Sequence, residues 1–277
     1  GMSVLHRDGP LIMGILNVTP DSFSDGGQFN TIESAVNQGK QMIDEGADII
    51  DIGGESTRPG SERVSVEEQI ERVVHIINAI NVTKPDHVEI SIDTTRSRVA
   101  EAALAAGATI VNDVSGGNDE PEIIDLCASK GCPYIIMHML GTPDIMQKQP
   151  VYEDVVLDIK QFLESRIEQC IRAGIDKKHI IIDPGIGFGK TREHNLLLLK
   201  NVTVFVETGY LVLMGTSRKR FMGSICKVDA PNELIGATAA TTALGVHAGV
   251  KLFRVHDVKP NRQAADVAWM ILNSQIN

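Results

Sequence analysis

Long hydrophobic runs are missing from this chain of 277 residues, although 43% of its residues are hydrophobic. No run approaches the roughly 18 to 20 apolar residues that cross a bilayer, so the sequence predicts no membrane span. An excess of basic charge is missing as well, because the formal net charge is −10. Such a surface disfavours nucleic acid and anionic membranes as partners, and any anionic ligand must be held in a local pocket.

Cysteine is scarce, and its four copies show no paired spacing. A chain of this length needs no disulfide staples and no signal segment opens it, so we expect a reduced, cytoplasmic protein. No His/Cys cluster has the spacing of a zinc site, which argues against structural or hydrolytic zinc. No Ser, Cys or Lys lies in a motif that is typical of covalent catalysis.

The chain contains instead a series of eight short apolar runs that are rich in Ile and Val. Most are almost continuously apolar, as expected of parallel strands that are covered on both faces. The predicted strands are 11–18, 47–54, 89–94, 109–116, 133–139, 180–186, 211–217 and 251–258.

Segments with helical signatures separate these strands, and glycine follows the last apolar turn of five of them, which is the usual stop signal. Ser65 and Glu68 form a capping pattern before one amphipathic stretch. The predicted helices are 31–46, 65–80, 96–106, 121–130, 152–173, 192–206, 231–248 and 260–273. Eight strand–helix units in one unbroken series favour a (β/α)8 TIM barrel of the α/β class, formed by a single domain over residues 2–277.

The stretch IDPGIGFGKT (182–191) comes within one position of a nucleotide-binding phosphate loop. That loop needs glycine where Pro184 stands, and proline has a fixed φ and no N–H to donate. The three glycines also miss the spacing of the dinucleotide fingerprint. We therefore interpret the stretch as a strand that ends at Asp183, followed by a thin turn, with Lys190 and Thr191 starting the next helix.

Polar residues end almost every predicted strand. In a barrel these ends and the loops after them build the site, and each buried polar group costs on the order of 1–3 kcal/mol if it has no partner. Their convergence therefore indicates a site, in which the oxygen of Asn17 suits Mg²⁺ held partly by a substrate's phosphates. The strand-end residues are Asn17, Asp51 with Glu55, Asp93, Asn112 with Asp113, His138, Asp183, Ser217 with Arg218 and Lys219, and Arg254 with His256.

Several of these residues allow a second interpretation. Asp51 and Asp113 are equally suited to cap the next helix or brace a loop, and a lone His138 is more often a satisfied core histidine than a ligand. Arg254 and His256 lie two residues apart on one strand and point to the same side, which favours an anion site shared by two cationic donors.

Two loops rich in Gly, Ser and Asp follow the first two predicted strands, at 17–27 and 53–62. The first carries Phe23, and the second carries Arg58 and Pro59. These loops are typical of lids that order over a second substrate, and an ordinary solvated turn is the alternative.

Six stretches, in this order, resemble the bacterial dihydropteroate synthase family: MGILNVTPDSFSDGG, DIGGESTRPG, SIDT, DPGIGFGKT, GTSRKRF and RVHDV. The resemblance covers nearly the whole chain. It implies a transferase that joins 6-hydroxymethyl-7,8-dihydropterin pyrophosphate to p-aminobenzoate, releasing pyrophosphate and making 7,8-dihydropteroate for folate biosynthesis. In that family sulfonamides compete for the p-aminobenzoate site.

The resemblance also implies roles for individual residues. The pterin would be held in a slot formed by Asp93, Asn112, Met137, Asp183, Phe188, Gly215 and Lys219. Pyrophosphate would be held by Asn17, Thr57, Arg254 and His256, with Mg²⁺ at Asn17. The p-aminobenzoate pocket and its loops would comprise Phe23, Asp25, Arg58, Pro59, Ser217 and Arg220.

Two rival functions fit parts of the pattern. A corrinoid-type methyltetrahydrofolate methyltransferase shares the barrel and the Asp-Pro-Gly strand end, but it lacks the SFSDGG and STRPG loops. A non-catalytic pterin-binding paralogue would be expected to lose loop residues first, whereas this chain keeps them. The family usually forms homodimers, and the Ala/Gly-rich segment 231–248 is suited to close packing against a partner copy.

Overall fold

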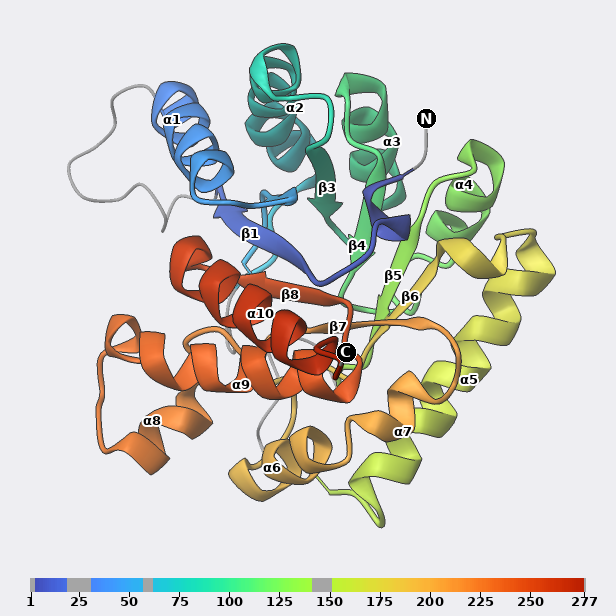
Figure 1. Cartoon of the computed structure of the whole chain (residues 1–277). Coiled ribbons are helices and arrows are strands. Elements are labelled where there is room, and N and C mark those ends of the chain that lie inside the picture. Colours follow the sequence, from blue (N-terminus) through green and yellow to red (C-terminus); the bar gives the residue numbers. More distant parts are fainter. Residues whose placement is uncertain (1–2, 19–30, 57–61, 141–150, 277) are drawn as a thin grey trace.

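The predicted apolar strands form and close into a barrel. The computed structural model describes residues 3–18, 31–56, 62–140 and 151–276. Its eight parallel strands are hydrogen-bonded in sequence order, and the last pairs with the first, which confirms the (β/α)8 barrel (Figure 1). The strands are β1 Leu11–Asn17, β2 Ile49–Gly53, β3 Glu89–Asp93, β4 Ile110–Asp113, β5 Tyr134–Met137, β6 Ile180–Asp183, β7 Leu211–Met214 and β8 Leu252–Val255.

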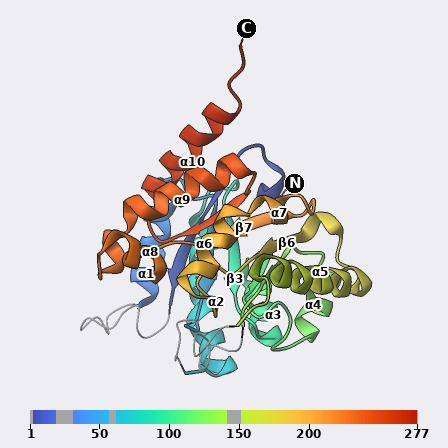
Figure 2. The ribbon, with the colours of Figure 1, turned by 90° about the horizontal axis from the view of Figure 1, so that it is seen from below.

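Helices follow the strands and surround the barrel, with α9 and α10 side by side (Figures 1 and 2). None of the helices within the described ranges combines the length and the hydropathy needed to cross a membrane. The helices are α1 Thr31–Asp44, α2 Val66–Thr83, α3 Ser97–Ala106, α4 Glu122–Lys130, α5 Val155–Ala173, α6 Arg192–Lys200, α7 Thr203–Val206, α8 Arg220–Cys226, α9 Ile235–Ala248 and α10 Val258–Leu272, and the 3-10 turns are η1 Val4–His6, η3 Lys177–His179 and η4 Pro231–Glu233.

Two predictions of helix extent were wrong, and one short helix was not predicted. The segment 192–206 contains two helices, because the chain leaves helical geometry at Asn201, where φ is −110° and ψ is 24°. The segment 231–248 begins with a separate 3-10 turn and becomes α-helical only after Leu234. The short helix α8 was not predicted, since its seven residues are too few to show a clear apolar period.

The alternation of each strand divides the buried side chains into two sets. One set lies between the barrel and the helices and forms the larger core. The other lies inside the barrel, where residues such as Met13, Ile49 and Leu213 pack together with Val4 and Leu5 of η1. This apolar plug fills the amino-terminal end of the barrel, so the next interior positions toward the carboxyl ends of the strands are left for polar residues.

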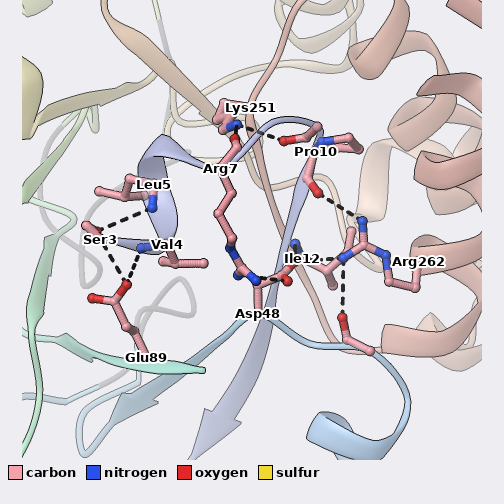
Figure 3. Close-up of polar contacts among 12 residues, drawn as sticks. Ser3, Val4, Leu5, Arg7, Pro10, Ile12, Asp48, Glu89, Lys251 and Arg262 are labelled. Atoms are coloured by element: carbon pink, nitrogen blue, oxygen red, sulfur yellow. Dashed lines mark hydrogen bonds and ion pairs between the residues drawn. The ribbon is translucent and has the colours of Figure 1, made fainter. Parts of the chain in front are cut away.

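Ion pairs and carbonyl contacts close the amino-terminal end of the barrel (Figure 3). Asp48, which precedes β2, pairs with Arg7 at 3.1 Å and with Arg262 of α10 at 2.7 Å. Its carboxylate also accepts the backbone N–H of Ile12 at 2.8 Å. Lys251 donates to the carbonyl groups of Arg7 and Gly9. These contacts join the first strands to the last helix and leave the opposite end of the barrel for function.

Candidate active site

A cavity of about 1060 Å³ lies at the carboxyl ends of the strands. Asp93 does not line the cavity, but its carboxylate forms an ion pair with Arg254, which lines the cavity. The predicted residues Phe23, Asp25, Thr57, Arg58 and Pro59 lie outside the described residues. The predicted residues that line the cavity are Asn17, Asn112, Met137, Asp183, Phe188, Gly215, Ser217, Lys219, Arg220, Arg254 and His256.

A buried ion-pair network occupies the barrel interior beneath this cavity. Arg254 donates from Nε to Asp51 at 2.7 Å and from Nη2 to Asp93 at 3.2 Å. Asp51 also accepts from the hydroxyl of Ser91 at 2.6 Å and from the amide of Asn112 at 3.2 Å. The second interpretation of Asp51, as a helix cap or loop brace, was therefore wrong, because its carboxylate joins four strands inside the barrel. Burial and the negative charge of Asp51 raise the pKa of Asp93.

Asp183 ends β6 and lines the cavity with a buried carboxylate. Burial raises its pKa to about 6, while the N–H of Gly185, at 2.8 Å from Oδ1, and the charge of Lys219 oppose that rise. Gly185 has a φ of +75°, and an added Cβ would lie 1.9 Å from the carbonyl oxygen of His138. Only glycine fits this turn, which agrees with the prediction of a thin chain after the strand.

Phe188 and Lys219 meet on the wall of the cavity. The ammonium of Lys219 lies 4.1 Å from the centroid of the Phe188 ring, within cation–π range. Burial and the nearby charge of Arg254 lower the pKa of Lys219 to about 8. An aromatic face and an amine close to a buried carboxylate suit a flat heterocycle that presents both donors and acceptors.

His256 is held by Ser217 rather than by a charged partner. The Ser217 hydroxyl lies 2.7 Å from Nδ1 of His256 and accepts the backbone N–H of the same residue at 2.9 Å. Burial and the positive charge of Arg254 lower the pKa of His256 to about 3. Without a bound anion the imidazole of His256 is therefore neutral at neutral pH, and the anion site shared with Arg254 stays a prediction.

Lys190 was predicted only to start the next helix, and this was wrong. Thr191 does cap α6 through its side chain. Lys190, however, is 5% exposed, lines the cavity and donates to the carbonyl of Phe188 at 2.8 Å. Its Nζ also lies 3.1 Å from Nδ1 of His138.

Two strand-end residues have structural partners. His138 is buried and packs edge-on against Phe162, with ring centroids 4.9 Å apart, which confirms the satisfied core histidine. Asp113 accepts the N–H groups of Ser115 and Gly117 and the hydroxyl of Tyr134, and so braces a loop as the second interpretation predicts.

Metal ligands are sparse around the cavity. Among the residues that the structure describes, no group of three or more His, Cys, Asp or Glu side chains is arranged to hold an ion. Asn17, half-buried at the end of β1, lines the cavity, and its side-chain amide contains one oxygen of the kind that binds Mg²⁺. This donor fits Mg²⁺ only as an ion whose other ligands are water and a substrate's phosphate oxygens.

Comparisons with known proteins agree with this site. The family model described as pterin binding enzyme matches residues 13–256. The dihydropteroate synthase of a Synechocystis species is 45% identical over 261 residues, which are 93% of this chain and 90% of that protein.

Two solved structures are similar to the whole chain. The Xanthomonas albilineans dihydropteroate synthase with 4-aminobenzoic acid superposes with a TM-score of 0.90 and 41% identity, covering 97% of this chain and 95% of that one. The Yersinia pestis dihydropteroate synthase in complex with a sulfonamide drug has a TM-score of 0.91 and 37% identity, covering 99% and 97%. The chain therefore belongs to the pterin binding enzyme family and, within it, to the dihydropteroate synthases.

Proposed function

We propose that the protein condenses 6-hydroxymethyl-7,8-dihydropterin pyrophosphate with p-aminobenzoate to give 7,8-dihydropteroate and pyrophosphate. The carbon–oxygen bond to pyrophosphate breaks, the amine forms a carbon–nitrogen bond to the same methylene, and the amine loses a proton. The observation that carries the proposal is one cavity in which a buried carboxylate, an aromatic ring and an arginine lie together, in a chain that aligns with dihydropteroate synthases over nearly its whole length.

We assign the pterin to the slot formed by Asp183, Asn112, Phe188 and Lys219. The Asp183 carboxylate, with a pKa of about 6, is mostly ionised at neutral pH and accepts hydrogen bonds from the donor edge of the ring. Lys219 reaches the ring carbonyl, and Met137 and Gly215 complete the walls. Asp93 holds Arg254 at 3.2 Å, so it connects the pterin end of the site to the pyrophosphate end.

We assign the pyrophosphate to Arg254, His256 and Asn17. Arg254 uses Nε and Nη2 for Asp51 and Asp93, while Nη1 has no partner within the described part of the chain. In the tautomer in which the Ser217 hydroxyl donates to Nδ1, the His256 ring proton lies on Nε2 and can be donated to a phosphate oxygen. Mg²⁺ bound by the phosphates and Asn17 would neutralise part of the leaving group's charge.

The chemistry that these residues perform is electrostatic stabilisation. Departure of pyrophosphate leaves a methylene conjugated to the pterin with cationic character, and the fixed donors of Arg254 and His256 stabilise the departing anion. Ser217 and Arg220 lie on the same wall and are assigned to p-aminobenzoate, the exposed guanidinium of Arg220 suiting its carboxylate. The roles predicted for the residues outside the described ranges are proposed unchanged: pyrophosphate is assigned to Thr57, and the p-aminobenzoate pocket and its loops to Phe23, Asp25, Arg58 and Pro59.

The test is pyrophosphate release that requires both the pterin ester and p-aminobenzoate. Release with both substrates supports the synthase, whereas methyl transfer from methyltetrahydrofolate to a corrinoid supports the methyltransferase alternative, and pterin binding without turnover supports the silent paralogue. Arg254→Ala should lower kcat about 100-fold, because a donor to the leaving group is removed. Intact turnover in this variant would contradict the pyrophosphate assignment, and tight pterin binding by Asp183→Asn would contradict the pterin assignment.

We also propose a homodimer in a reducing cytoplasm. The outer side of α9 and α10 exposes the apolar residues Leu244, Val267, Met270 and Ile271, which suits a partner copy. Gly245 of α9 is needed for packing within the chain, because an added Cβ would lie 2.6 Å from Phe253.

The reducing location is supported by the cysteines, all four of which are free. Sedimentation of the wild type and Leu244→Glu, and cell fractionation, test the two proposals.

A further inference from the structure

Lys190 is a buried cation to which the proposed chemistry gives no role. It precedes the first turn of α6, and its Nζ reaches three acceptors: the Phe188 carbonyl at 2.8 Å, His138 Nδ1 at 3.1 Å and the His138 carbonyl at 3.4 Å. No carboxylate in the described part of the chain lies within ion-pair distance of this ammonium. Burying a charge without a counter-ion costs free energy. The start of helix α6 does not require a buried lysine, so the burial of Lys190 indicates another role.

These contacts fix the turn that carries Phe188. The ammonium joins the end of β5, at His138, to the turn after β6. The hydroxyl of Tyr152 adds a neutral tether to the next residue, donating to the carbonyl of Gly189 at 2.9 Å. Lys219 passes close to the same turn, since a Cβ on Gly187 would lie 2.9 Å from its Cδ. The turn therefore sets the positions of both the Phe188 ring and Lys219.

The same ammonium lies close to Asp183. A Cβ on Gly185 would lie 3.1 Å from Nζ of Lys190, and the N–H of Gly185 is bonded to the Asp183 carboxylate. A positive charge at this position favours the ionised carboxylate, although the two groups do not touch.

We propose that Lys190 is a positioning residue of the pterin slot, whose ammonium locks the Phe188 turn to the end of β5 and supplies positive charge behind Asp183. The proposal rests on the assignment of the pterin to Asp183, Phe188 and Lys219.

The pH dependence of pterin binding separates this role from simple tethering. The titratable and charged groups that face Lys190 or Asp183 are His138, His194, Lys219 and Arg254. Burial lowers the pKa of Lys190 to about 7, so the ammonium is mostly charged near pH 6, where Asp183 titrates. Removing the Lys190 ammonium should raise the pKa of Asp183 further. Pterin binding is lost as the pH falls and Asp183 becomes protonated, and this fall in affinity, the acidic limb of the binding curve, should then move to higher pH.

The experiment measures binding of 6-hydroxymethyl-7,8-dihydropterin, which has no phosphate to titrate, between pH 5 and 9 in the full-length protein. Lys190→Met should weaken binding about tenfold at neutral pH, because the Phe188 turn is no longer held in place for the ring, and should move the acidic limb to higher pH. Lys190→Arg should restore the limb. Tyr152→Phe is the matched control, since it removes a tether of the same turn without removing charge and should leave the limb in place.

Lys190→Gln keeps a donor without the charge and should move the limb as Lys190→Met does, so it carries the test if the methionine protein does not fold. A wild-type acidic limb in these neutral variants overturns the proposal for Lys190. Asp183→Asn separates the two assignments: if it binds the pterin as tightly as the wild type, the slot itself is wrong, whatever the lysine variants do. An unchanged KM for p-aminobenzoate in Lys190→Met supports a role confined to the pterin slot.

Discussion

Arg218 carries the clearest sign of local strain beside the cavity, because its φ of 58° lies in the left-handed region that non-glycine residues rarely adopt. Its guanidinium holds Asp257 with two hydrogen bonds, at 2.9 and 3.1 Å, and its N–H donates to Thr238 at 3.2 Å. The residues on either side, Ser217 and Lys219, both line the cavity. The strained turn therefore sets the positions of both Ser217 and Lys219, which are proposed to contact the substrates.

Comparing two substitutions of Arg218 measures this strain. Arg218→Gly and Arg218→Ala both remove the ion pair with Asp257, but only alanine pays the steric penalty of a positive φ. We expect the free energy of unfolding of Arg218→Gly to exceed that of Arg218→Ala by about 1 kcal/mol in urea titrations. Equal stabilities would mean that the turn relaxes and that the strain is absent in solution.

His256, which lines the cavity, is expected to respond to pyrophosphate, whereas the buried His138, which does not line it, is not. Burial lowers the pKa values of both His138 and His256 to about 3, so both imidazoles should stay neutral from pH 8 down to pH 5. A bound anion stabilises the protonated form, so pyrophosphate should raise the pKa of His256 and leave that of His138 unchanged. NMR titration of the imidazole resonances measures both. A shift at His138 alone would place the anion elsewhere.

The two-residue period of the strands determines which polar side chains reach the site. Asp51 follows Ile49 at the same parity, and Ile49 belongs to the apolar cluster inside the barrel. Asp113 has the opposite parity to Asn112, so its carboxylate faces the helices and bonds Tyr134. Applying this period to the sequence would have placed Asp51 in the site and excluded Asp113, without a structure.

Other features depend on contacts that no local pattern encodes. Lys190 stands at the start of a helix, where lysine is usually solvated, and only the approach of β5 to the turn after β6 surrounds it with acceptors. The pairing of Arg254 with Asp51 and Asp93 needs the four adjacent strands β8, β1, β2 and β3 in register. The neutral state of His256 follows from its burial. Strand order and eleven of the residues that line the cavity were predictable, but the ionisation of the site was not.

Asp51 should be energetically coupled to Arg254 across the barrel. Asp51→Asn leaves a buried guanidinium with one carboxylate, which should lower the free energy of unfolding by about 3 kcal/mol. Removing the guanidinium as well, in Asp51→Asn with Arg254→Met, should cost less than the sum of the two single changes. Ser91→Ala removes only a neutral donor to Asp51 and should cost about 1 kcal/mol. Additive losses in urea unfolding would show that the pair contributes no coupling.

The molecule as a whole separates stability from function along the axis of the barrel. The interior is apolar at the amino-terminal end, where Val4 and Leu5 complete the packing, and it is polar and charged at the carboxyl-terminal end. The contacts around Asp48 close the first of these ends and bring residues from both termini together (Figure 3). Changes at this end are therefore expected to alter stability without altering substrate binding.

Asp48→Asn tests that separation. The carboxylate is largely shielded and serves Arg7, Arg262 and the backbone of Ile12, so its neutralisation should lower the free energy of unfolding by about 2 kcal/mol. The matched control is Asp266→Asn, because Asp266 pairs with the same Arg262 but is 57% exposed, and its loss should cost less than about 0.5 kcal/mol. Urea unfolding measures both, and pyrophosphate release should give wild-type KM values for both substrates. A raised KM in Asp48→Asn would mean that the two ends of the barrel are coupled, since this carboxylate and the cavity lie at opposite ends of the strands.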